Sequence, residues 1–504
     1  MTDAPSWLPV ADAASPWDQV HVVVAGLGRA GEAAASALLA LGAQVTVLDA
    51  AAGDRQRRRA EVLSQAGGEV RLGGELSLPD DAQLVVASPG LPPSDAWLVA
   101  AAARGIAVWS GEQLAWHLQP TRSPAPWLTV TGTNGKTTTV QMLTAILTAG
   151  GERAAAAGNI GWPLVEAVRA DPPYDVLAVE LSSFQLHFTR GVQAQASALL
   201  NVGADHLDWH GGFEAYTADK ARVFDGTRKT LVFNADDDVV QRLVRRAAQT
   251  TRAARVGFTL QPPRAGMLGV EDGHLVDAAF GSPSARRVRL LARDELSLAG
   301  EHNTANALAA AALALAHGSP HDAVAAGLRG FTVDAHRGST VGHLGPLTFV
   351  DDSKATNADA ARVSLQAYDR VLWVAGGLAK GASFDDLAQE VAGRLQGVVL
   401  IGRDRAVVHE ALRRHAPQVR VIEVDASETE VMDLVVDAAV RLAAPTGRQG
   451  MPVEPAQGTT VTVLLAPACA STDQFADYAA RGDAFVAAVR RRIGLHHDLR
   501  EDQR

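Results

Sequence analysis

The sequence predicts an α/β protein made of three domains in series, and three observations support this prediction. The chain has 504 residues, and at roughly 150 residues per domain this length corresponds to about three domains. Short apolar runs that end in glycine or a turn alternate with alanine-rich segments, which is the pattern of buried parallel strands and helices. Glycine-rich turns at 26–31 and 132–135 each follow an apolar run and precede a helical segment.

The first domain, residues 1–120, is predicted to be Rossmann-like. The runs "VHVVVAGLG", "AQVTVLD", "AQLVVASPG" and "GIAVWS" are strand-like, with helical segments such as "GEAAASALLALG" between them. Gly26, Gly28 and Gly31 form a G-x-G-x-x-G pattern after the first strand, and Asp49 closes the next. Such a loop presents backbone N–H groups and a helix N-terminus to a pyrophosphate. Taken alone, the pattern also fits an NAD-dependent dehydrogenase.

The other two domains follow the proline-rich segment "QPTRSPAP", which is typical of a linker. The central domain, residues 121–334, opens with "WLTVTGTNGKTTTV" and ends in alanine-rich helices near 303–328. It is predicted to be a P-loop ATPase-like domain with a mainly parallel sheet. The third domain, residues 335–504, contains the strand-like runs "LTFVDDS", "RVLWVAGG", "GVVLIGR", "RVIEVD" and "VTVLLAPA". It is predicted to be a Rossmann-like α/β domain.

The segment "VTGTNGKTTTV" predicts a phosphate-binding loop. Gly132 and Gly135 let the backbone approach a ligand closely, Lys136 supplies a charge, and the Thr137 hydroxyl suits Mg²⁺. The first glycine of the common P-loop spacing is absent, because residue 130 is valine. Like charges 4 Å apart repel by about 4 kcal/mol at an effective dielectric near 20, so a triphosphate beside a second anion needs metal ligands.

Candidate metal ligands follow two other strand-like runs. Glu180 lies in "AVELSS", at the end of the strand-like run, and His206 lies in "NVGADHLDWH". Because ligands gather at the carboxyl ends of strands in an open parallel sheet, we expect both residues near the loop.

Composition and charge narrow the class of protein. The net charge of −10 argues against a nucleic-acid partner, for which a basic stripe is expected. The single cysteine, Cys469, excludes an intramolecular disulfide, fits a reducing compartment and is expected to be a buried core thiol. No stretch reaches the 18 or more apolar residues of a membrane span, and the first residues do not form a secretion signal. A cytoplasmic monomer is expected.

A series of motifs resembles the Mur ligases, ATP-dependent amide-bond-forming enzymes of peptidoglycan precursor synthesis that are related to folylpolyglutamate synthases. "TGTNGKTTT", "GNIGWP", "VELSSFQL", "NVGADHLD", "AYTADKARVF", "AGEHNTANALAAAAL" and "DDSKATN" occur in the family's order. The family's shortened loop also accounts for Val130. The ending "LLAPACASTDQFADYAARGDAF" is similar to members that use D-glutamate. The resemblance implies that ATP phosphorylates the carboxylate of UDP-N-acetylmuramoyl-L-alanine, and that the amine of D-glutamate attacks the acyl phosphate.

The resemblance also implies roles for individual residues. The catalytic residues would be Lys136, Glu180, His206, Lys220 and Asn159. Two Mg²⁺ ions would be held by Thr137, Glu180, His206 and Lys220, the last as a carbamate. ATP would be bound by Gly132, Thr133, Asn134, Gly135, Lys136, Thr137, Thr138, Asn303, Asn306, Arg337 and Asp352. The UDP-substrate would be bound by Gly26, Gly28, Gly31, Asp49, Ser88, Pro89 and Gly90. D-glutamate would be bound by Lys354, Thr356, Lys380, Ser471 and Tyr478.

The sequence departs from the family pattern at Gly203-Ala204, Leu378-Ala379, Ala466 and Tyr478, which puts the geometry of the D-glutamate pocket in question. Three alternatives stay open. One is a sister Mur ligase or a folylpolyglutamate-synthase-like ligase. Another is the NAD-dependent dehydrogenase, which has no use for a second phosphate loop with metal ligands. The third is a non-catalytic nucleotide-binding scaffold, which the joint presence of Lys136, Glu180, His206 and Lys220 disfavours.

Overall fold

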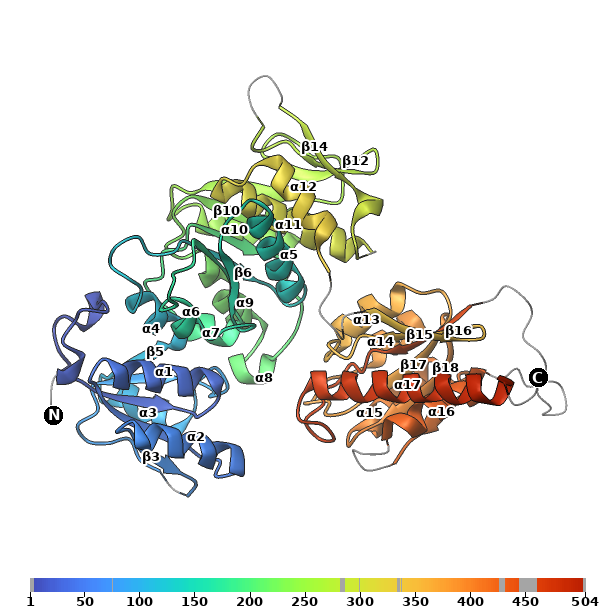
Figure 1. Cartoon of the computed structure of the whole chain (residues 1–504), viewed down its shortest axis with the longest axis horizontal. Coiled ribbons are helices and arrows are strands. Elements are labelled where there is room, and N and C mark those ends of the chain that lie inside the picture. Colours follow the sequence, from blue (N-terminus) through green and yellow to red (C-terminus); the bar gives the residue numbers. More distant parts are fainter. Residues whose placement is uncertain are drawn as a thin grey trace. The chain divides into compact units, whose positions relative to one another are not determined.

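The computed structural model describes residues 4–74, 76–281, 286–298, 300–332, 336, 338–425, 431–443 and 460–501. These residues form three mainly parallel sheets with helices between the strands, which confirms the predicted α/β class (Figure 1). The chain divides into two compact units between Phe331 and Thr332. The first unit holds two sheets and the second holds one.

The N-terminal sheet has the order β3-β2-β1-β4-β5, and all its neighbouring strands are parallel. β1 is buried along its whole length because it lies between β2 and β4, where the strand order reverses. The loop after β1 therefore lies at the switch point where such sheets bind ligands. The strands are His21–Ala25, Gln44–Asp49, Glu69–Leu72, Leu84–Ala87 and Ala107–Ser110, and helices α1–α4 are Arg29–Ala40, Asp54–Gln65, Ala96–Ala103 and Gly111–His117.

The central sheet has nine strands in the order β14-β13-β12-β11-β10-β9-β6-β8-β7. It is parallel from β7 to β12, and β12, β13 and β14 pair antiparallel. β6 lies between β8 and β9, so this sheet also reverses its order beside a glycine loop. Strands β6–β14 are Trp127–Thr131, Ala154–Gly158, Val176–Glu180, Ala196–Leu199, Thr230–Asn234, Ala254–Phe258, Met267–Glu271, His274–Asp277 and Val288–Ala292.

The helices of the central region pack around this sheet. The long helices α11 and α12 both contact α5, as expected for the alanine-rich segments near 303–328. Helices α5–α12 are Lys136–Ala149, Leu164–Ala167, Ser183–Phe188, Leu207–His210, Phe213–Ala221, Asp238–Ala247, Glu301–His317 and His321–Gly330. Short 3-10 helices occupy Leu8–Val10, Trp17–Gln19, Arg222–Phe224 and Arg293–Glu295.

Two strand regions of the central sheet were not expected from the sequence. β7 reads "AAAAG", and alanine is depleted in strands and favours helices. Its pairing with β8 along five residues decides its conformation. Strands β11–β14 also escaped the prediction, because each has only four or five residues and none forms a long apolar run.

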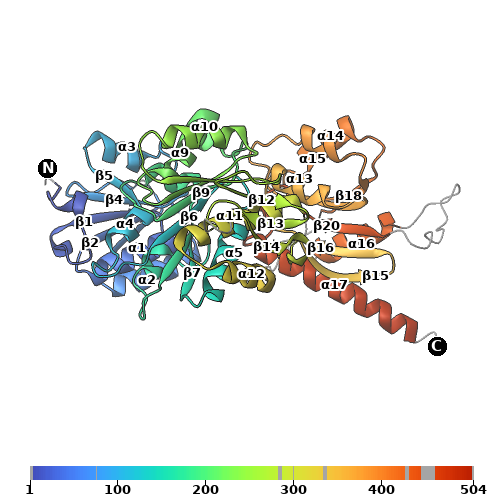
Figure 2. The ribbon, with the colours of Figure 1, turned by 90° about the horizontal axis from the view of Figure 1, so that it is seen from above.

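The C-terminal sheet has the order β15-β16-β20-β17-β18-β19, in which β15 and β16 are antiparallel and the other neighbours parallel. Figure 2 shows α17 as a long helix, and it contacts α16 and β15 of the same unit. The strands β15–β20 are Ser339–Leu344, Leu347–Asp351, Val371–Gly376, Leu395–Ile401, Val421–Glu423 and Val461–Leu465. The helices α13–α17 are Ala358–Gln366, Asp385–Val391, Arg405–His415, Val431–Ala443 and Tyr478–Glu501.

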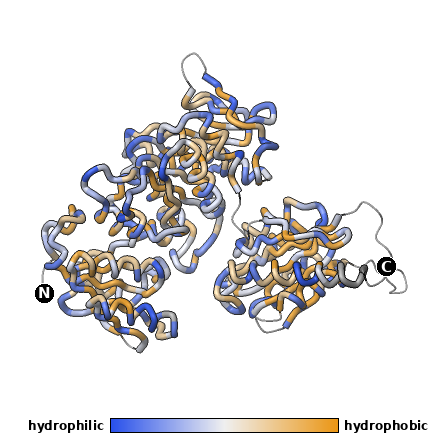
Figure 3. Tube along the Cα trace, in the orientation of Figure 1, coloured by the Kyte–Doolittle hydropathy of each residue, from blue (hydrophilic) through white to orange (hydrophobic). Residues whose placement is uncertain are grey.

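The hydrophobic residues concentrate in the strands and the inner faces of helices of each unit, while loops are mostly hydrophilic (Figure 3). The largest buried side chains include Trp17 and Trp127 in the first unit and Trp373 in the second. Among the described residues, no helix combines the length and the apolar character needed to cross a bilayer.

Candidate active site

The loop after β6 has the backbone of a phosphate-binding loop. β6 is completely buried, and α5 begins at Lys136 directly after Gly135. Gly135 has a φ of +82°, and a Cβ at this position would lie 2.3 Å from Oδ1 of Asn306. Glycine is therefore required both by the left-handed backbone and by the approach of the Asn306 side chain. The N-terminus of α5 lies directly after this loop, and helix N-termini favour anions through their first N–H groups.

The end of β9 holds this loop in place through Asn201. The backbone N–H of Asn134 donates to Oδ1 of Asn201 (2.8 Å), and Nδ2 of Asn201 donates to the carbonyl of Asn134 (3.1 Å). The hydroxyl oxygen of Thr133 is 2.8 Å from the Tyr216 hydroxyl and accepts from the N–H of Gly203 (2.9 Å). Gly203 differs from the family pattern, but its contact with Thr133 uses only the backbone N–H and so does not depend on a side chain. Sequence reasoning missed Asn201, whose only signal is its place just after a strand.

Two lysines converge on the loop. Nζ of Lys136 donates to the carbonyl oxygens of Gly132 and Thr133, both at 2.8 Å. Nζ of Lys220 donates to the same carbonyl of Gly132 at 2.7 Å, although Lys220 is only 2% exposed. Burial, together with the charge of Lys136, holds the pKa of Lys220 well below its usual range, against the opposing effect of Asp205 and Glu180. Two amines thus lie beside the loop.

Glu180 ends β8, the strand next to β6, and offers an oxygen suited to a metal ion. Its side chain is 1% exposed, and Oε1 accepts a hydrogen bond from Nδ2 of Asn159 at 2.7 Å. Oε2 is buried and has no hydrogen-bond partner among the described residues. A buried carboxylate oxygen without a partner is costly, and carboxylate and hydroxyl oxygens are the ligands that Mg²⁺ prefers. Glu180, with Thr137 at the start of α5, therefore fits Mg²⁺.

His206 precedes α8 with a φ of +51°, a conformation that non-glycine residues adopt rarely and mainly at functional sites. Its Nε2 is 3.5 Å from Oδ2 of Asp205, and its ring centroid is 4.7 Å from that of Phe184. The side chain is 40% exposed. A carboxylate beside the ring nitrogen orients the imidazole, as it does for many metal-ligating histidines.

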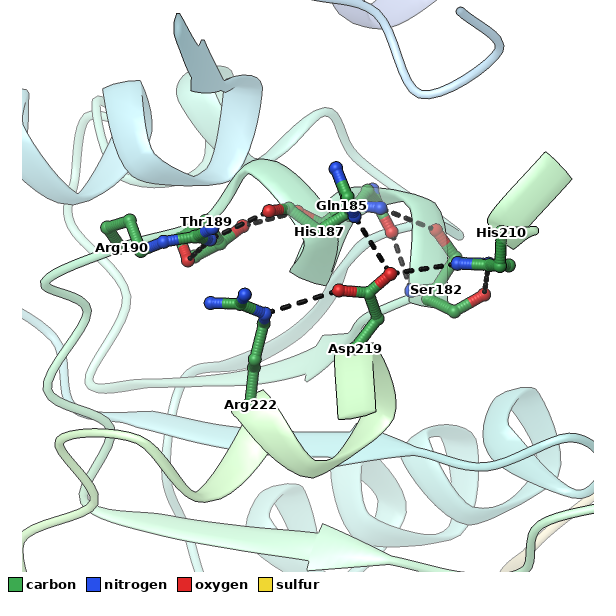
Figure 4. Close-up of polar contacts among 9 residues, drawn as sticks. Ser182, Gln185, His187, Thr189, Arg190, His210, Asp219 and Arg222 are labelled. Carbon is green, nitrogen blue, oxygen red and sulfur yellow. Dashed lines mark hydrogen bonds and ion pairs between the residues drawn. The ribbon is translucent and has the colours of Figure 1, made fainter. Parts of the chain in front are cut away.

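A polar cluster fixes α9, the helix that carries Lys220. Oδ2 of Asp219 accepts hydrogen bonds from Nδ1 of both His187 and His210, each at 2.8 Å, and Figure 4 shows the two imidazoles pointing at this carboxylate. Nε of Arg222 is 3.2 Å from Oδ1 of Asp219. Burial raises the pKa of Asp219, but the hydrogen bonds from the histidines outweigh it and hold the pKa far below its usual range. The cluster therefore contains a permanent carboxylate.

The ligand atoms of His187, His210 and Asp219 lie within 4.8 Å of one another. They already bond to one another, and Nε2 of His210 is 3.0 Å from the hydroxyl of Ser183. The geometry is therefore that of a hydrogen-bond network. Sequence reasoning missed the roles of Asp219 and His187, and the only signal for Asp219 is its place beside Lys220.

Asn303 and Asn306 both lie in the first turns of α11 and are 8% and 6% exposed. Residues three apart share one face of a helix, and Asn306 places its Oδ1 against Gly135. The structure thus brings Asn306 to the phosphate loop, in line with the predicted nucleotide site. Thr137 and Thr138 are buried in the first turn of α5.

The glycine loop after β1 is tightly packed. Gly26 has a φ of +97° and accepts a hydrogen bond from the Ser88 hydroxyl at 3.0 Å. A Cβ on Gly31 would lie 2.0 Å from the carbonyl oxygen of Gly26, so the glycine allows α1 to pack on the loop. Asp49 braces the loop, because its Oδ2 accepts from the N–H of Leu27 at 2.6 Å. The predicted contact of Asp49 with the UDP-substrate must therefore share a carboxylate that already supports the loop.

This N-terminal loop is linked to the segment that carries Asn159. Nη2 of Arg29 donates to the carbonyl of Gly161 at 3.0 Å, and Gly161 lies two residues after Asn159. Pro89 and Gly90 continue from Ser88 in a turn after β4. A ligand seated on the glycine loop would thus lie near the segment that carries Asn159, which in turn bonds to Glu180.

In the C-terminal unit, the candidates for D-glutamate binding follow adjacent strands. β20 lies between β16 and β17; Lys354 and Thr356 follow β16, Lys380 follows β17, and Ser471 follows β20. Nζ of Lys354 lies 3.9 Å from the centroid of the Tyr478 ring, a distance typical of a cation–π contact. Tyrosine supplies this ring face as phenylalanine would.

Residues near this site that differ from the family pattern make their contacts through backbone atoms. Leu378 and Ala470 exchange two backbone hydrogen bonds of 2.9 and 3.0 Å, and the carbonyl of Ala466 accepts from Nε1 of Trp373 at 2.7 Å. Lys380 is exposed and has a φ of +49°. These contacts do not depend on the side chains that differ from the family pattern.

The remaining predicted residues are placed as follows. Asp352 belongs to the C-terminal unit, where its Oδ2 accepts a hydrogen bond from the Ser364 hydroxyl. Arg337 lies outside the described residues. Cys469 is a free, buried thiol, and burial raises its pKa to about 12, which confirms the prediction of a core residue and excludes an activated nucleophile.

The fold and the site together are those of an α/β protein with a phosphate loop and candidate metal ligands. Comparisons with known proteins lead to the same class. Three family models match in chain order: the Mur ligase MurD-like N-terminal domain (residues 20–110), the Mur ligase middle domain (130–314) and the Mur ligase glutamate ligase domain (336–449). The UDP-N-acetylmuramoylalanine–D-glutamate ligase of Streptomyces avermitilis is 50% identical over 475 residues, covering 94% of this chain and 98% of that protein. The one of Mycolicibacterium smegmatis is 45% identical, with coverage of 94% and 97%.

Solved structures support the fold. The UDP-N-acetylmuramate-alanine ligase MurC of Thermotoga maritima superposes with a TM-score of 0.54 at 17% identity, covering 94% of this chain and 99% of that one. A murein peptide ligase of Psychrobacter arcticus gives a TM-score of 0.51 at 18% identity, covering 93% and 98%. The chain belongs to the Mur ligase family.

Proposed function

We propose that this protein is an ATP-dependent ligase that joins D-glutamate to UDP-N-acetylmuramoyl-L-alanine in peptidoglycan precursor synthesis. Relatives with this name that are about half identical over nearly the whole chain support the assignment. The observation that carries the chemistry is the arrangement around the phosphate loop. There, two lysines share the carbonyl of Gly132, and one oxygen of the buried Glu180 carboxylate has no hydrogen-bond partner in the part of the chain that the structure describes.

The reaction needs a carboxylate to become an acylating agent. Transfer of the γ-phosphoryl group of ATP to the substrate carboxylate makes an acyl phosphate, and the amine of D-glutamate then displaces phosphate through a tetrahedral intermediate. The protein contributes mainly positioning and charge. We assign Lys136 and the N-terminus of α5 to the ATP phosphates, Asn306 to the nucleotide side of the loop, and Asn159 to the acyl phosphate.

Mg²⁺, when bound, neutralises the phosphate charge and aligns the transferring group. We assign Thr137, Glu180, His206 and Lys220, the last as a carbamate, as the residues that would hold two Mg²⁺ ions. The burial and depressed pKa of Lys220 support this assignment, because only the neutral amine adds to CO₂. Asp205 orients His206, and Asn159 holds the other oxygen of Glu180.

The substrate sites follow from the same geometry. We assign the loop of Gly26, Gly28 and Gly31, with Asp49 and the turn 88–90, to the UDP moiety. Two lysines, Lys354 and Lys380, suit a dicarboxylate acceptor, with Thr356, Ser471 and Tyr478 beside them. The domain limits 1–120, 121–334 and 335–504 stay proposals, as do Arg337 and Asp352 as nucleotide contacts. The acidic net charge supports the absence of a nucleic-acid partner, and the single cysteine supports a cytoplasmic location. The monomeric state stays a proposal.

Product analysis tests the proposal directly. The protein is mixed with ATP, Mg²⁺, UDP-N-acetylmuramoyl-L-alanine and, separately, D-glutamate, L-glutamate, L-alanine or diaminopimelate. We expect ADP release that matches amide formation and requires D-glutamate. Another preferred amino acid, or a preference for UDP-N-acetylmuramate or a folate as acceptor of the phosphoryl group, would move the protein to a sister ligase or to the folylpolyglutamate synthases.

The carbamate is tested separately by ¹³C NMR under ¹³CO₂ at neutral pH. We expect a carbamate signal that is lost in Lys220→Ala, and partial recovery of the variant's activity with a small carboxylate that replaces the missing oxygens. An unmodified lysine in the active protein would remove the carbamate from the mechanism. It would leave the ligase assignment intact.

A further inference from the structure

A fully buried arginine bonds to two segments that carry candidates for D-glutamate binding, without being one of the predicted ligands. Arg481 is 0% exposed and lies one turn after Tyr478 on α17. Its Nε donates to the Ser353 hydroxyl at 3.0 Å, and its Nη2 donates to the carbonyl of Ser353 at 2.9 Å. Its Nη1 donates to the carbonyl of Cys469 at 3.1 Å. One guanidinium thus joins the segment after β16 to the loop after β20.

The segment after β16 alternates between buried and accessible residues. Asp351 and Ser353 are 0% exposed, whereas Asp352 and Lys354, which stand between and after them, are only partly buried. The buried residues are tied inward, since the N–H of Ser353 donates to Oδ1 of Asp351 at 2.9 Å. The buried residues Asp351 and Ser353 therefore fix the position of the backbone that carries Lys354.

The same arginine is coupled to the ring beside Lys354. The Ser353 hydroxyl, which accepts from Arg481, donates to the carbonyl of Tyr478 at 2.7 Å. The ring of Tyr478 lies against Nζ of Lys354. Tyr478, in the first turn of α17, thus contacts Ser353 through its carbonyl and Lys354 through its ring.

The charge of Arg481 is retained in this buried place. Its direct hydrogen-bond acceptors are neutral, and the carboxylates that support its charge through space are Asp351 and Asp473. Burial lowers the pKa of Arg481 to about 10, so the guanidinium stays ionised near neutral pH. Burying a charged guanidinium that bonds only to neutral acceptors carries a large desolvation cost, although it joins two loops. Lysine has a single donor centre and cannot span three acceptors as the guanidinium fork does.

We infer that Arg481 is a positioning residue for the acceptor amino acid. It sets the spacing between the segment that carries Lys354 and the loop that carries Ser471, and so determines how well a dicarboxylate is bound. This inference rests on the proposed function. It adds a residue that touches no substrate but controls the acceptor site.

The test compares steady-state constants of the full-length protein and Arg481→Lys. We expect the KM for D-glutamate to rise about tenfold or more, which corresponds to about 1.4 kcal/mol, while the KM values for ATP and UDP-N-acetylmuramoyl-L-alanine stay within about twofold. Positional isotope exchange in ATP, measured with the nucleotide substrate and without D-glutamate, should be unchanged. A general loss of structure would move all three KM values and the exchange rate together.

A matched control is Arg394→Lys. Nη1 of Arg394 donates to the carbonyl of Tyr368 at 3.0 Å and to Oδ1 of Asp369 at 3.3 Å, in the same unit but outside the segments that carry the D-glutamate candidates. We expect unchanged constants. If Arg481→Lys does not fold, Ser353→Ala replaces it, because this smaller change removes the hydroxyl that links Arg481 to Tyr478.

The outcomes separate the inference from the proposed function. A wild-type protein that makes no product with D-glutamate refutes the function. A wild-type protein that makes product, with a folded variant whose KM for D-glutamate is unchanged or rises no more than the other two KM values, overturns the role of Arg481.

Discussion

Replacement of Gly135 by alanine is the sharpest test of the phosphate loop. The φ of +82° at this residue costs an L-amino acid about 1–2 kcal/mol. The new Cβ would also lie 2.3 Å from Oδ1 of Asn306, closer than carbon and oxygen can approach without bonding. Either the loop or the Asn306 side chain must therefore shift, and both belong to the proposed nucleotide site. We expect ATP affinity to fall by at least about tenfold, which corresponds to about 1.4 kcal/mol.

Gly151→Ala is the matched control for this experiment. Gly151 has a φ of +88°, lies just beyond the other end of α5, and has open space where a Cβ would stand. The backbone cost is the same, about 1–2 kcal/mol in the free energy of unfolding, but no side chain is displaced. Calorimetric titration with ATP and Mg²⁺ measures the affinity, and urea unfolding measures the stability. Gly151→Ala should lose stability and keep its ATP affinity.

The double variant Gly135→Ala with Asn306→Ala separates the clash from the backbone strain. If the clash matters, the two substitutions together should cost less ATP affinity than the sum of the single losses. Equal ATP affinities for Gly135→Ala and the wild type would refute the reasoning, since the loop would then tolerate a side chain where the structure leaves no room.

Four further substitutions test charged residues of the first unit. Lys136→Ala should abolish ADP formation in a coupled assay while the unfolding transition is retained. Glu180→Gln should raise the Mg²⁺ concentration needed for half-maximal activity, because an amide is a poorer ligand than a carboxylate. Asp219→Asn should reduce stability at pH 7 by about 1–3 kcal/mol; since its pKa is lowered in the folded protein, the difference from wild type should shrink as pH falls below the ordinary aspartate pKa. The Lys220 carbamate signal should weaken in the same variant. Burial raises the pKa of Glu112, so Glu112→Gln should become more stable relative to wild type as pH rises above the ordinary glutamate pKa, as measured by thermal unfolding.

The sequence by itself determined the class of fold and most of the site around the loop. Strands, glycine turns and the Gly-Lys-Thr segment are local patterns, so their spacing along the chain is enough to predict a phosphate site after a buried strand. The carboxyl-end rule for parallel sheets led us to expect Glu180 and His206 near the loop. Glu180 ends β8, His206 lies in the segment between β9 and α8, and β8 and β9 flank β6.

Tertiary structure decided the features that depend on partners distant in the chain. An alanine-rich segment became β7 because β8 offered five residues to pair with, a contact that outweighs helix propensity. Asn201 stabilises the loop from a neighbouring strand, and Asp219 collects two histidines from other helices. Arg481 joins residues more than one hundred positions away in the sequence. A local sequence pattern does not encode such contacts. They form only when folding brings distant residues together and removes water from around their polar groups.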